Sequence, residues 1–535
     1  MSLLEIQDLI IEVGRAGAPA QVVAGLNLCV ERGSTTVLVG ESGSGKSMSA
    51  LGIVRLLPRA ARIKGGAVLL EGQDLLRISE AAMCDVRGAR IGFVFQEPQD
   101  ALNPVMRVGD QIGEVLTRHR GLRGLARRTR VVELLEAVGI PEAGQRLNGY
   151  PHQFSGGMKQ RVMLAIALAG EPDLLIADEP TTALDVSTQA QILTLLRSEQ
   201  QQRGMGMLFI THDLAVAHQV ADTLAVMQAG RLVEIGSHAD IFERPTHPYT
   251  QHLLRVSPRI QPDLAPPPLP VEAEPLLIAR GLCVRFPGRR GLFGRIITQV
   301  TAVDNVDLIV HGGETVAIVG ESGSGKTTLG RGLLRLLQVD AGSVNFGGRE
   351  FFELDRKALR QARRDIQVVF QDPFSSMNPR LTVREIIEEG MTAQGLGGSR
   401  QGREQRVARL LEQVGLEAAS IARFPHEFSG GQRQRICIAR ALAVEPKLLV
   451  CDEPTSALDV SVQAQILTLL RTLQQEMGLA YLFITHNLGV VAQIAHRVVV
   501  MHQGRIVESG PTQTVLFKPT HPYTQSLLAA VPRLP

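Results

Sequence analysis

The sequence predicts an α/β protein that consists of two tandem domains built on the same plan. A glycine-rich segment occurs twice, as GESGSGKS at residues 40–47 and as GESGSGKT at residues 320–327. Each copy follows a short apolar run that is typical of a buried strand, and each precedes a segment that is compatible with a helix. Further segments of the first half recur in the second half, which indicates an internal repeat.

The repeated segments have the same order in both halves and therefore predict the domain boundaries. After each glycine-rich segment come VFQ, FSGG, an apolar run ending in DEPT, then TH and finally THPYT. We expect a first domain at residues 1–255, a linker at 256–275 and a second domain at 276–535. The prolines of the linker favour a stiff, extended spacer, although a tether without a geometric role is equally compatible with them.

Composition and charge narrow the class of protein. Of the 535 residues, 56 are basic and 53 are acidic, and tryptophan is absent, so neither bulk charge nor stacking surfaces favour nucleic-acid binding. The five cysteines form no C-x-x-C pair and fit no zinc site, and apolar neighbours predict that most are buried. No apolar run is long enough to span a membrane, and the N-terminus lacks the basic start of a signal peptide. We expect the chain in the cytosol or on a membrane surface.

Both glycine-rich segments match the P-loop pattern G-x-x-x-x-G-K-[ST]. Glycines let the backbone curl so that successive N–H groups face an anion, and the following helix adds its positive N-terminal end. The lysine would reach the β- and γ-phosphates, and the final hydroxyl would serve Mg²⁺. The predicted nucleotide-binding residues are Gly40, Glu41, Ser42, Gly43, Ser44, Gly45, Lys46, Ser47, Gly320, Glu321, Ser322, Gly323, Ser324, Gly325, Lys326, Thr327 and Thr328.

Polar residues that follow apolar strands supply the remaining candidates for catalysis. An amide at the end of VFQ suits both a metal and a water, and the Asp-Glu pair follows a run typical of a buried parallel strand. The aspartate suits Mg²⁺, the glutamate suits a general base for the attacking water, and the histidine suits a sensor of the γ-phosphate. The predicted catalytic residues are Gln96, Glu179, His212, Gln371, Glu453 and His486. The predicted metal ligands are Ser47, Gln96, Asp178, Thr327, Gln371 and Asp452.

Two further features predict contacts with nucleotide. Each FSGG segment opens a helix and so forms a second anion-binding N-terminus. Phe286 ends the predicted first strand of the second half, where it would stack on an adenine ring, while its first-half counterpart is Val13. The residues of the FSGG helix starts are Ser155, Gly156, Gly157, Ser429, Gly430, Gly431 and Gln432.

The order of these motifs resembles that of the ATP-binding-cassette ATPases. The motif set occurs twice, and the resemblance covers essentially the whole chain. FSGGM and FSGGQ resemble that family's signature, and ADEPTTALD and CDEPTSALD resemble its Walker B and D-loop segments. The resemblance implies two cassettes, each with a mixed-sheet core and a helical subdomain, that pair head to tail around two ATP molecules. Each P-loop site would then receive the FSGG helix start of the other cassette. Met158 departs from the usual glutamine, and we expect that departure to be tolerated.

Closer features resemble the ATPases of the dipeptide, oligopeptide and nickel importers. PTHPYTQHLL and PTHPYTQSLL resemble the tail motif of that group, and the fused arrangement and length are closest to the microcin C-type importers. The resemblance implies ATP and Mg²⁺, two integral membrane permease subunits, indirectly a substrate-binding protein, and a peripheral place on the cytoplasmic face of the inner membrane. Without the cysteine-rich tail of many relatives, we predict no iron–sulfur cluster. Locally, HPYT also fits a proline-fixed turn with a packed tyrosine.

Other functions remain as alternatives at this point. A twin-cassette ATPase acting on the ribosome would also lack membrane spans, but such proteins carry a long, charged helical linker, unlike residues 256–275. A DNA-repair cassette would need zinc-type cysteine pairs, and the sequence has none. A non-hydrolysing binding module is disfavoured because both general-base glutamates are present. The basic run at residues 118–130 fits a solvated helix face or a contact with anionic lipid or a membrane partner.

Overall fold

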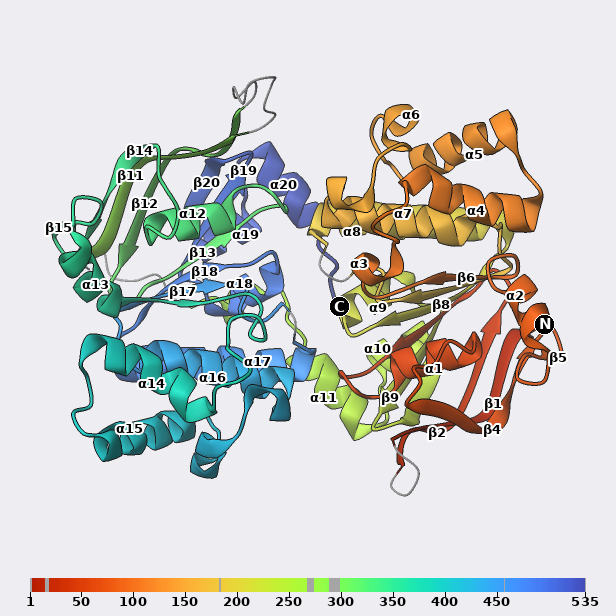
Figure 1. Cartoon of the computed structure of the whole chain (residues 1–535), viewed down its shortest axis with the longest axis horizontal. Helices are drawn as coiled ribbons and strands as arrows, with labels where there is room; N and C mark the ends of the chain where they lie inside the picture. Colours follow the sequence, from red (N-terminus) through yellow and green to blue (C-terminus); the bar gives the residue numbers. More distant parts are fainter. Residues whose placement is uncertain are drawn as a thin grey trace. The chain divides into compact units, whose positions relative to one another are not determined.

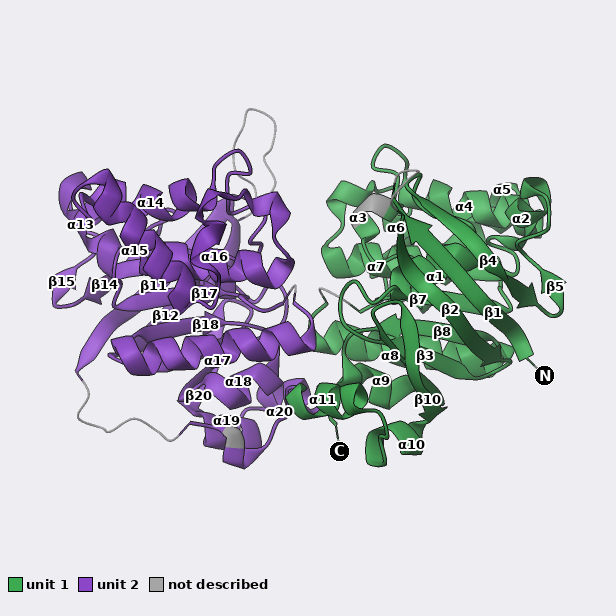
Figure 2. Ribbon diagram, turned by 90° about the horizontal axis from the view of Figure 1, so that it is seen from below, with its two compact units in different colours: residues 1–257, 532–535 green, residues 258–531 purple. Residues whose placement is uncertain are grey.

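The computed structural model describes residues 2–14, 19–181, 184–266, 274–287, 299–456 and 458–534. The chain divides into two compact units, one of residues 1–257 and 532–535 and the other of residues 258–531 (Figure 2). Residues 267–273 of the predicted linker lie outside the described residues. The described part of the linker contains a short 3₁₀ helix at Pro262–Leu264.

Unit 1 contains one mixed six-stranded sheet and one antiparallel four-stranded sheet (Figure 1). In the larger sheet the order is β10-β9-β3-β8-β7-β6, and all neighbours are parallel except β10, which pairs antiparallel with β9. The smaller sheet has the order β2-β1-β4-β5. The strands are β1 (Ser2–Val13), β2 (Ala20–Glu31), β3 (Thr35–Val39), β4 (Ala61–Leu70), β5 (Gln73–Asp74), β6 (Ile91–Val94), β7 (Leu174–Asp178), β8 (Gly206–Thr211), β9 (Thr223–Gln228) and β10 (Arg231–Ser237).

The helices of unit 1 include α4 and α5, which pack on one another and on α7 as a helical subdomain. Short 3₁₀ turns, such as Pro151–Gln153, join some of the elements. The helices are α1 (Lys46–Ile53), α2 (Glu80–Val86), α3 (Pro98–Ala101), α4 (Val108–Arg120), α5 (Gly124–Ala137), α6 (Ala143–Arg146), α7 (Gly156–Ala169), α8 (Val186–Arg203), α9 (Leu214–Val220), α10 (His238–Glu243) and α11 (Pro248–Val256).

Unit 2 repeats this plan with the sheets β16-β17-β18-β13-β19-β20 and β12-β11-β14-β15. Its helical subdomain consists of α14 and α15 packed on α16. The strands are β11 (Pro275–Pro287), β12 (Gln299–His311), β13 (Thr315–Val319), β14 (Ala341–Phe346), β15 (Arg349–Glu350), β16 (Ile366–Val369), β17 (Leu448–Asp452), β18 (Ala480–Ile484), β19 (Arg497–His502) and β20 (Arg505–Pro511). The helices are α12 (Lys326–Leu333), α13 (Arg356–Asp365), α14 (Val383–Gln394), α15 (Arg400–Gln413), α16 (Gly430–Leu442), α17 (Val460–Met477), α18 (Leu488–Ile494), α19 (Thr512–Phe517) and α20 (Pro522–Ala529).

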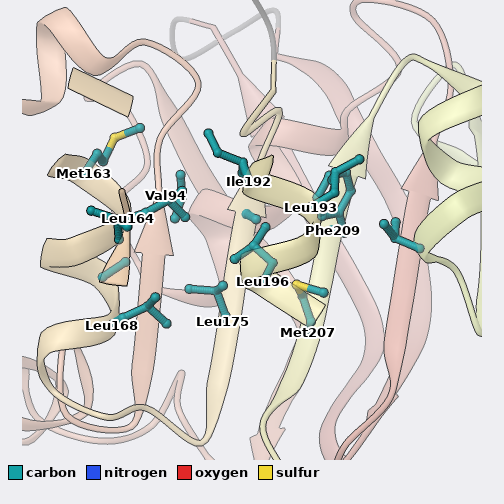
Figure 3. Close-up of a cluster of buried hydrophobic side chains, with 14 of the residues drawn as sticks. Val94, Met163, Leu164, Leu168, Leu175, Ile192, Leu193, Leu196, Met207 and Phe209 are labelled. Atoms are coloured by element: carbon teal, nitrogen blue, oxygen red, sulfur yellow. The ribbon is translucent and has the colours of Figure 1, made fainter. Parts of the chain in front are cut away.

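The central parallel strands are buried on both faces, which explains their continuous apolar sequences. Along β7, Leu175 packs with α7 and α8 on one face, whereas Leu174 and Ile176 face the other core, because side chains alternate along a strand. Figure 3 shows the first of these cores, where side chains from α7 and α8 meet those of β6, β7 and β8. The predicted α/β class, with two cassettes of mixed sheet and helical subdomain, is confirmed.

Long helices begin and end at residues suited to those positions. Asp185 caps α8 by accepting a hydrogen bond from the N–H of Thr188 at 2.9 Å, and Gly204 ends the helix in the left-handed conformation. Asp459 and Gly478 do the same for α17. Among the residues that the structure describes, no helix is both long and apolar enough to cross a membrane.

The prediction that most of the cysteines are buried is confirmed. Cys283, Cys437 and Cys451 are buried, but Cys84 is half-buried and Cys29 is exposed. Cys29 lies between the buried residues Leu28 and Val30 on β2, so the alternation of the strand turns its side chain outward. Apolar sequence neighbours therefore do not indicate burial at this position.

An ion pair between a buried glutamate and a half-buried arginine joins the starts of two strands in the larger sheet of unit 2. Glu314, immediately before β13, accepts hydrogen bonds from Arg497 Nε at 2.8 Å and from Arg497 Nη2 at 3.2 Å. The N–H of His311 donates to the same carboxylate at 2.8 Å. Burial alone would raise the pKa of Glu314, but the Arg497 guanidinium and these hydrogen bonds hold the pKa below its ordinary value.

We expect Glu314→Gln to destabilise the chain at pH 7 by about 1–3 kcal/mol, because the charged hydrogen bonds to Arg497 weaken. A carboxylate with a lowered pKa stabilises the fold above its unfolded pKa, and this stability is lost as pH falls through the folded value. The difference between wild type and variant should therefore shrink below about pH 4, in urea unfolding followed by circular dichroism. The exposed Glu353→Gln is the matched control. A gap that persists undiminished at pH 3 would contradict this account.

Candidate ATP-hydrolysing site

The predicted site residues of unit 1 follow neighbouring strands of one sheet. The P-loop follows β3, His212 follows β8, Asp178 ends β7, and Gln96 lies just beyond β6. These strands are adjacent and parallel in the order β3-β8-β7-β6. Their carboxyl ends consequently bring residues from distant parts of the sequence to one edge, where open α/β sheets place their ligands.

The P-loop wraps around a buried lysine. Gly45 precedes α1 in the left-handed conformation, and a Cβ at this position would collide with the carbonyl oxygen of Val22. Lys46 is only 4% exposed, and its Nζ donates to the carbonyl oxygens of Gly40 and Glu41, both at 2.8 Å. In unit 2, Lys326 makes the same two contacts at 2.8 and 2.7 Å. Each loop thus holds a positive charge at the start of a helix, as an anion site requires.

A hydroxyl and a carboxylate meet beside each P-loop. Ser47 Oγ donates to Asp178 Oδ1 at 3.0 Å, and Thr327 Oγ1 donates to Asp452 Oδ1 at 2.9 Å. Burial raises the pKa of Asp178 to about 6 and also raises the pKa of Asp452, because the carboxylate loses water that would stabilise its charge, and the adjacent glutamate adds to the effect. Hydroxyl and carboxylate oxygens are hard donors, so both pairs fit Mg²⁺.

Glu179 is held by two neighbours in an unusual backbone conformation. Its carboxylate accepts from Gln96 Nε2 at 3.1 Å and lies 3.0 Å from His212 Nδ1. The residue has a φ of 47°, in the left-handed region that non-glycine residues seldom adopt and that is common at functional sites. Burial alone would lower the pKa of His212, but the Glu179 carboxylate raises it overall.

Unit 2 repeats this arrangement around Glu453. Gln371 Nε2 donates to its carboxylate at 2.9 Å, His486 Nδ1 lies 3.2 Å away, and the φ of Glu453 is 48°. Burial would raise the pKa of Glu453, but the contact with His486 lowers it overall. The structure therefore brings the predicted glutamine, glutamate and histidine together in both units, beside the Ser/Thr–Asp pair.

The two FSGG helix starts differ in their capping. Ser155 caps α7 and Ser429 caps α16, each by accepting from the N–H three residues later. In unit 2 the side-chain oxygen of Gln432 accepts a hydrogen bond from the N–H of Ser429 at 3.0 Å, whereas Met158 packs against the apolar core. Gly156, Gly157, Gly430 and Gly431 form the first turns. The pairing of these helix starts with the P-loop of the other cassette stays a prediction.

The candidate adenine contact lies at an accessible position. Phe286 is near the end of β11 and is 43% exposed, so its ring is available for stacking. Val13 at the end of β1 is half-buried. A role for Phe286 in binding adenine stays a prediction.

Sequence reasoning missed a residue that contacts each P-loop. Tyr249 Oη accepts a hydrogen bond from the N–H of Glu41 at 3.2 Å, and Tyr523 Oη accepts from the N–H of Glu321 at 3.1 Å. Both tyrosines belong to HPYT segments, which begin the helices α11 and α20 with proline in the first turn rather than forming an isolated turn. The signal was present, because HPYT recurs together with the other site motifs.

Comparison with known proteins identifies the family. The model of the ABC transporter family matches residues 23–182 and 303–456, which together are more than half of the chain. The chain belongs to the ABC transporter family. The model of the oligopeptide/dipeptide transporter C-terminal region matches residues 233–279 and 507–535, so each cassette carries one copy.

Similar proteins align with this ABC transporter ATPase over almost its whole length. The uncharacterized ABC transporter ATP-binding protein YejF of Escherichia coli K12 is 49% identical, with 99% of both chains covered. The glutathione import ATP-binding protein GsiA of Salmonella paratyphi A is 48% identical, with 99% of this chain and 89% of the relative covered. The peptidoglycan transport ATP-binding protein YejF of Agrobacterium fabrum is 47% identical, with 99% and 96% covered.

These matches decide the class of function. The chain is an ABC-type ATPase whose ATP hydrolysis is coupled to transport, so it binds ATP and works with membrane permease components. The expected importer family is confirmed, and the ribosome alternative receives no support, because both cassettes carry a transporter C-terminal region.

We expect Glu179→Gln and Glu453→Gln together to abolish ATP turnover while ATP binding persists, because the amide cannot accept the proton of the attacking water. Steady-state phosphate release and ATP binding by calorimetry check this. Loss of one general base typically lowers turnover by about 10²–10⁴-fold at its site. Each single variant then reports on the remaining site, and full hydrolysis by the double variant would contradict the assignment of the bases.

Proposed function

We propose that this chain is the ATP-hydrolysing subunit of an importer of short peptides or related small substrates, glutathione among them. It binds peripherally to the cytoplasmic face of the inner membrane and docks on two integral membrane permease subunits. A substrate-binding protein delivers the substrate to those subunits and so acts on the ATPase indirectly. The paired oligopeptide/dipeptide transporter C-terminal regions are the observation that carries this proposal.

Two ATP sites drive the cycle in this proposal. Lys46 and Lys326 bind the phosphates, Glu179 and Glu453 act as general bases, and the neighbouring glutamines and histidines orient water and sense the γ-phosphate. Each site is completed by the FSGG helix start of the other cassette, so that ATP closes the pair and hydrolysis releases it. The duplicated contacts of Glu179 and Glu453 support hydrolysis at both sites.

Mg²⁺ is the metal that fits these sites. The candidate ligands are Ser47, Gln96 and Asp178 in the first cassette and Thr327, Gln371 and Asp452 in the second. When bound, Mg²⁺ would neutralise phosphate charge. We further propose that the chain carries no iron–sulfur cluster, which iron analysis and the visible spectrum of anaerobically purified protein test.

The segments that follow Gln96 and Gln371 are the proposed contacts with the permease subunits. They expose apolar side chains, Val105 at 79% and Phe374 at 54%. Exposed apolar groups beside a helical subdomain suit a partner helix. The test is to purify the tagged chain in mild detergent and to identify the proteins that accompany it.

We expect two polytopic membrane proteins to co-purify, and we expect cells with the complex to take up labelled short peptides or glutathione. The double variant Val105→Asp, Phe374→Asp should lose the membrane proteins and uptake while retaining ATP binding, because buried charges disfavour docking. Leu125→Asp, at another exposed apolar position, is the matched control. Recovery of ribosomes without membrane subunits would overturn the proposal.

A further inference from the structure

The peptide that joins Gly40 to Glu41 is held from both of its edges. Its N–H donates to Tyr249 Oη at 3.2 Å, and its carbonyl oxygen accepts from Lys46 Nζ at 2.8 Å. A trans peptide is planar, with its N–H and C=O on opposite edges, so the two contacts oppose each other across one rigid plane. The orientation of this plane therefore couples the tyrosine hydroxyl to the position of the lysine ammonium group.

Unit 2 contains the same linkage, formed from its own residues. The N–H of Glu321 donates to Tyr523 Oη at 3.1 Å, and the carbonyl oxygen of Gly320 accepts from Lys326 Nζ at 2.8 Å. The two units are separate examples of one arrangement. Recurrence in both argues against an accidental contact.

The tyrosine is itself fixed to the sheet that carries the P-loop. Glu234 on β10 accepts from the N–H of Thr246 at 2.7 Å, from Thr246 Oγ1 at 2.6 Å and from the N–H of His247 at 3.2 Å. His247 Nδ1 then accepts from the N–H of Tyr249 at 3.2 Å and so caps α11. β10 pairs with β9, and β9 pairs with β3, the strand that leads into the P-loop. The tyrosine and the P-loop are therefore attached to the same sheet.

In unit 2 the equivalent hydrogen bonds hold Tyr523. Glu508 on β20 accepts from the N–H and Oγ1 of Thr520 and from the N–H of His521, and His521 caps α20. The ring of His502 also lies against Tyr523, with ring centroids 3.9 Å apart. The last residue of β9, which corresponds to His502, is Gln228. The support for the second tyrosine therefore includes a ring contact that this glutamine cannot reproduce.

We propose that Tyr249 and Tyr523 are positioning residues for ATP, which keep each P-loop in the shape that accepts phosphate. Each hydroxyl fixes the peptide plane whose carbonyl anchors the lysine. This inference rests on the proposed role of Lys46 and Lys326 in binding the phosphates. Without the hydroxyl the plane turns more freely, the fraction of loops ready for phosphate falls, and the apparent Kd for ATP rises in proportion.

The test uses the full chain with Tyr249→Phe, Tyr523→Phe and both together, each in the Glu179→Gln, Glu453→Gln background so that ATP persists. Calorimetry with Mg-ATP should show one of two sites weakened about three- to tenfold in each single variant, and both in the double variant, as expected for loss of one hydrogen bond. With the glutamates intact, KM for ATP should rise while kcat at saturating ATP stays within about twofold, because bound ATP restores the loop.

Tyr481→Phe is the control for a purely structural hydroxyl. Tyr481 is buried, and its Oη donates to the carbonyl oxygen of Leu470 at 2.8 Å. This variant should lower the melting temperature and leave the Kd for ATP unchanged. If Tyr249→Phe and Tyr523→Phe behave in the same way, the positioning role is overturned.

Variants of the two P-loop lysines distinguish a failure of this inference from a failure of the proposed ATP sites. Lys46→Ala with Lys326→Ala should abolish ATP binding at both sites. Loss of binding in the lysine variant, together with an unchanged Kd in the tyrosine variants, overturns only the positioning role. Persistent ATP binding in the lysine variant would overturn the phosphate assignment and the positioning role together.

Discussion

A buried ammonium group determines the geometry of each P-loop. Lys46 is 4% exposed and Lys326 is 6% exposed, and an unpaired charge at such burial would be strongly destabilising. Each group donates hydrogen bonds to two backbone carbonyls and to a serine hydroxyl of its own P-loop. The loop therefore folds around a buried positive charge at the start of a helix, an arrangement that suits an anion. The glycines allow the tight backbone turns of this loop, and its position at the carboxyl ends of the strands places the lysine where α/β sheets bind ligands.

The carboxylates beside the lysine have different environments and so suit different tasks. Burial raises the pKa of Asp178 to about 6, and its partner is a serine hydroxyl rather than a base. Glu179, in contrast, contacts an amide and an imidazole and sits in a left-handed backbone conformation. Adjacent residues in the sequence thus point to different partners, one suited to a cation and the other to a water molecule.

The sequence was sufficient for most of the site because strand ends and motifs coincide. Apolar runs ending in Gln96, Asp178 or His212 predicted both a buried parallel strand and the polar residue that follows it. The tyrosine contact was not predictable in this way, because Tyr249 and Glu41 are far apart in sequence. Only the strand order β10-β9-β3 brings the HPYT helix to the P-loop. Cys29 shows the second limit, since the face of a strand depends on register that composition does not reveal.

The two cassettes share the groups expected to act on the phosphates and differ in the residues around those groups. Lysine, aspartate, glutamate, glutamine and histidine have equivalent contacts in both units, whereas Gln432 completes a capping box that Met158 cannot, and His502 packs on Tyr523 where the first unit has Gln228. These substitutions change how firmly a loop or helix start is held, without removing a reacting group. These differences in support should make the two ATP sites unequal through pre-organisation, which acts on affinity before it acts on the chemical step.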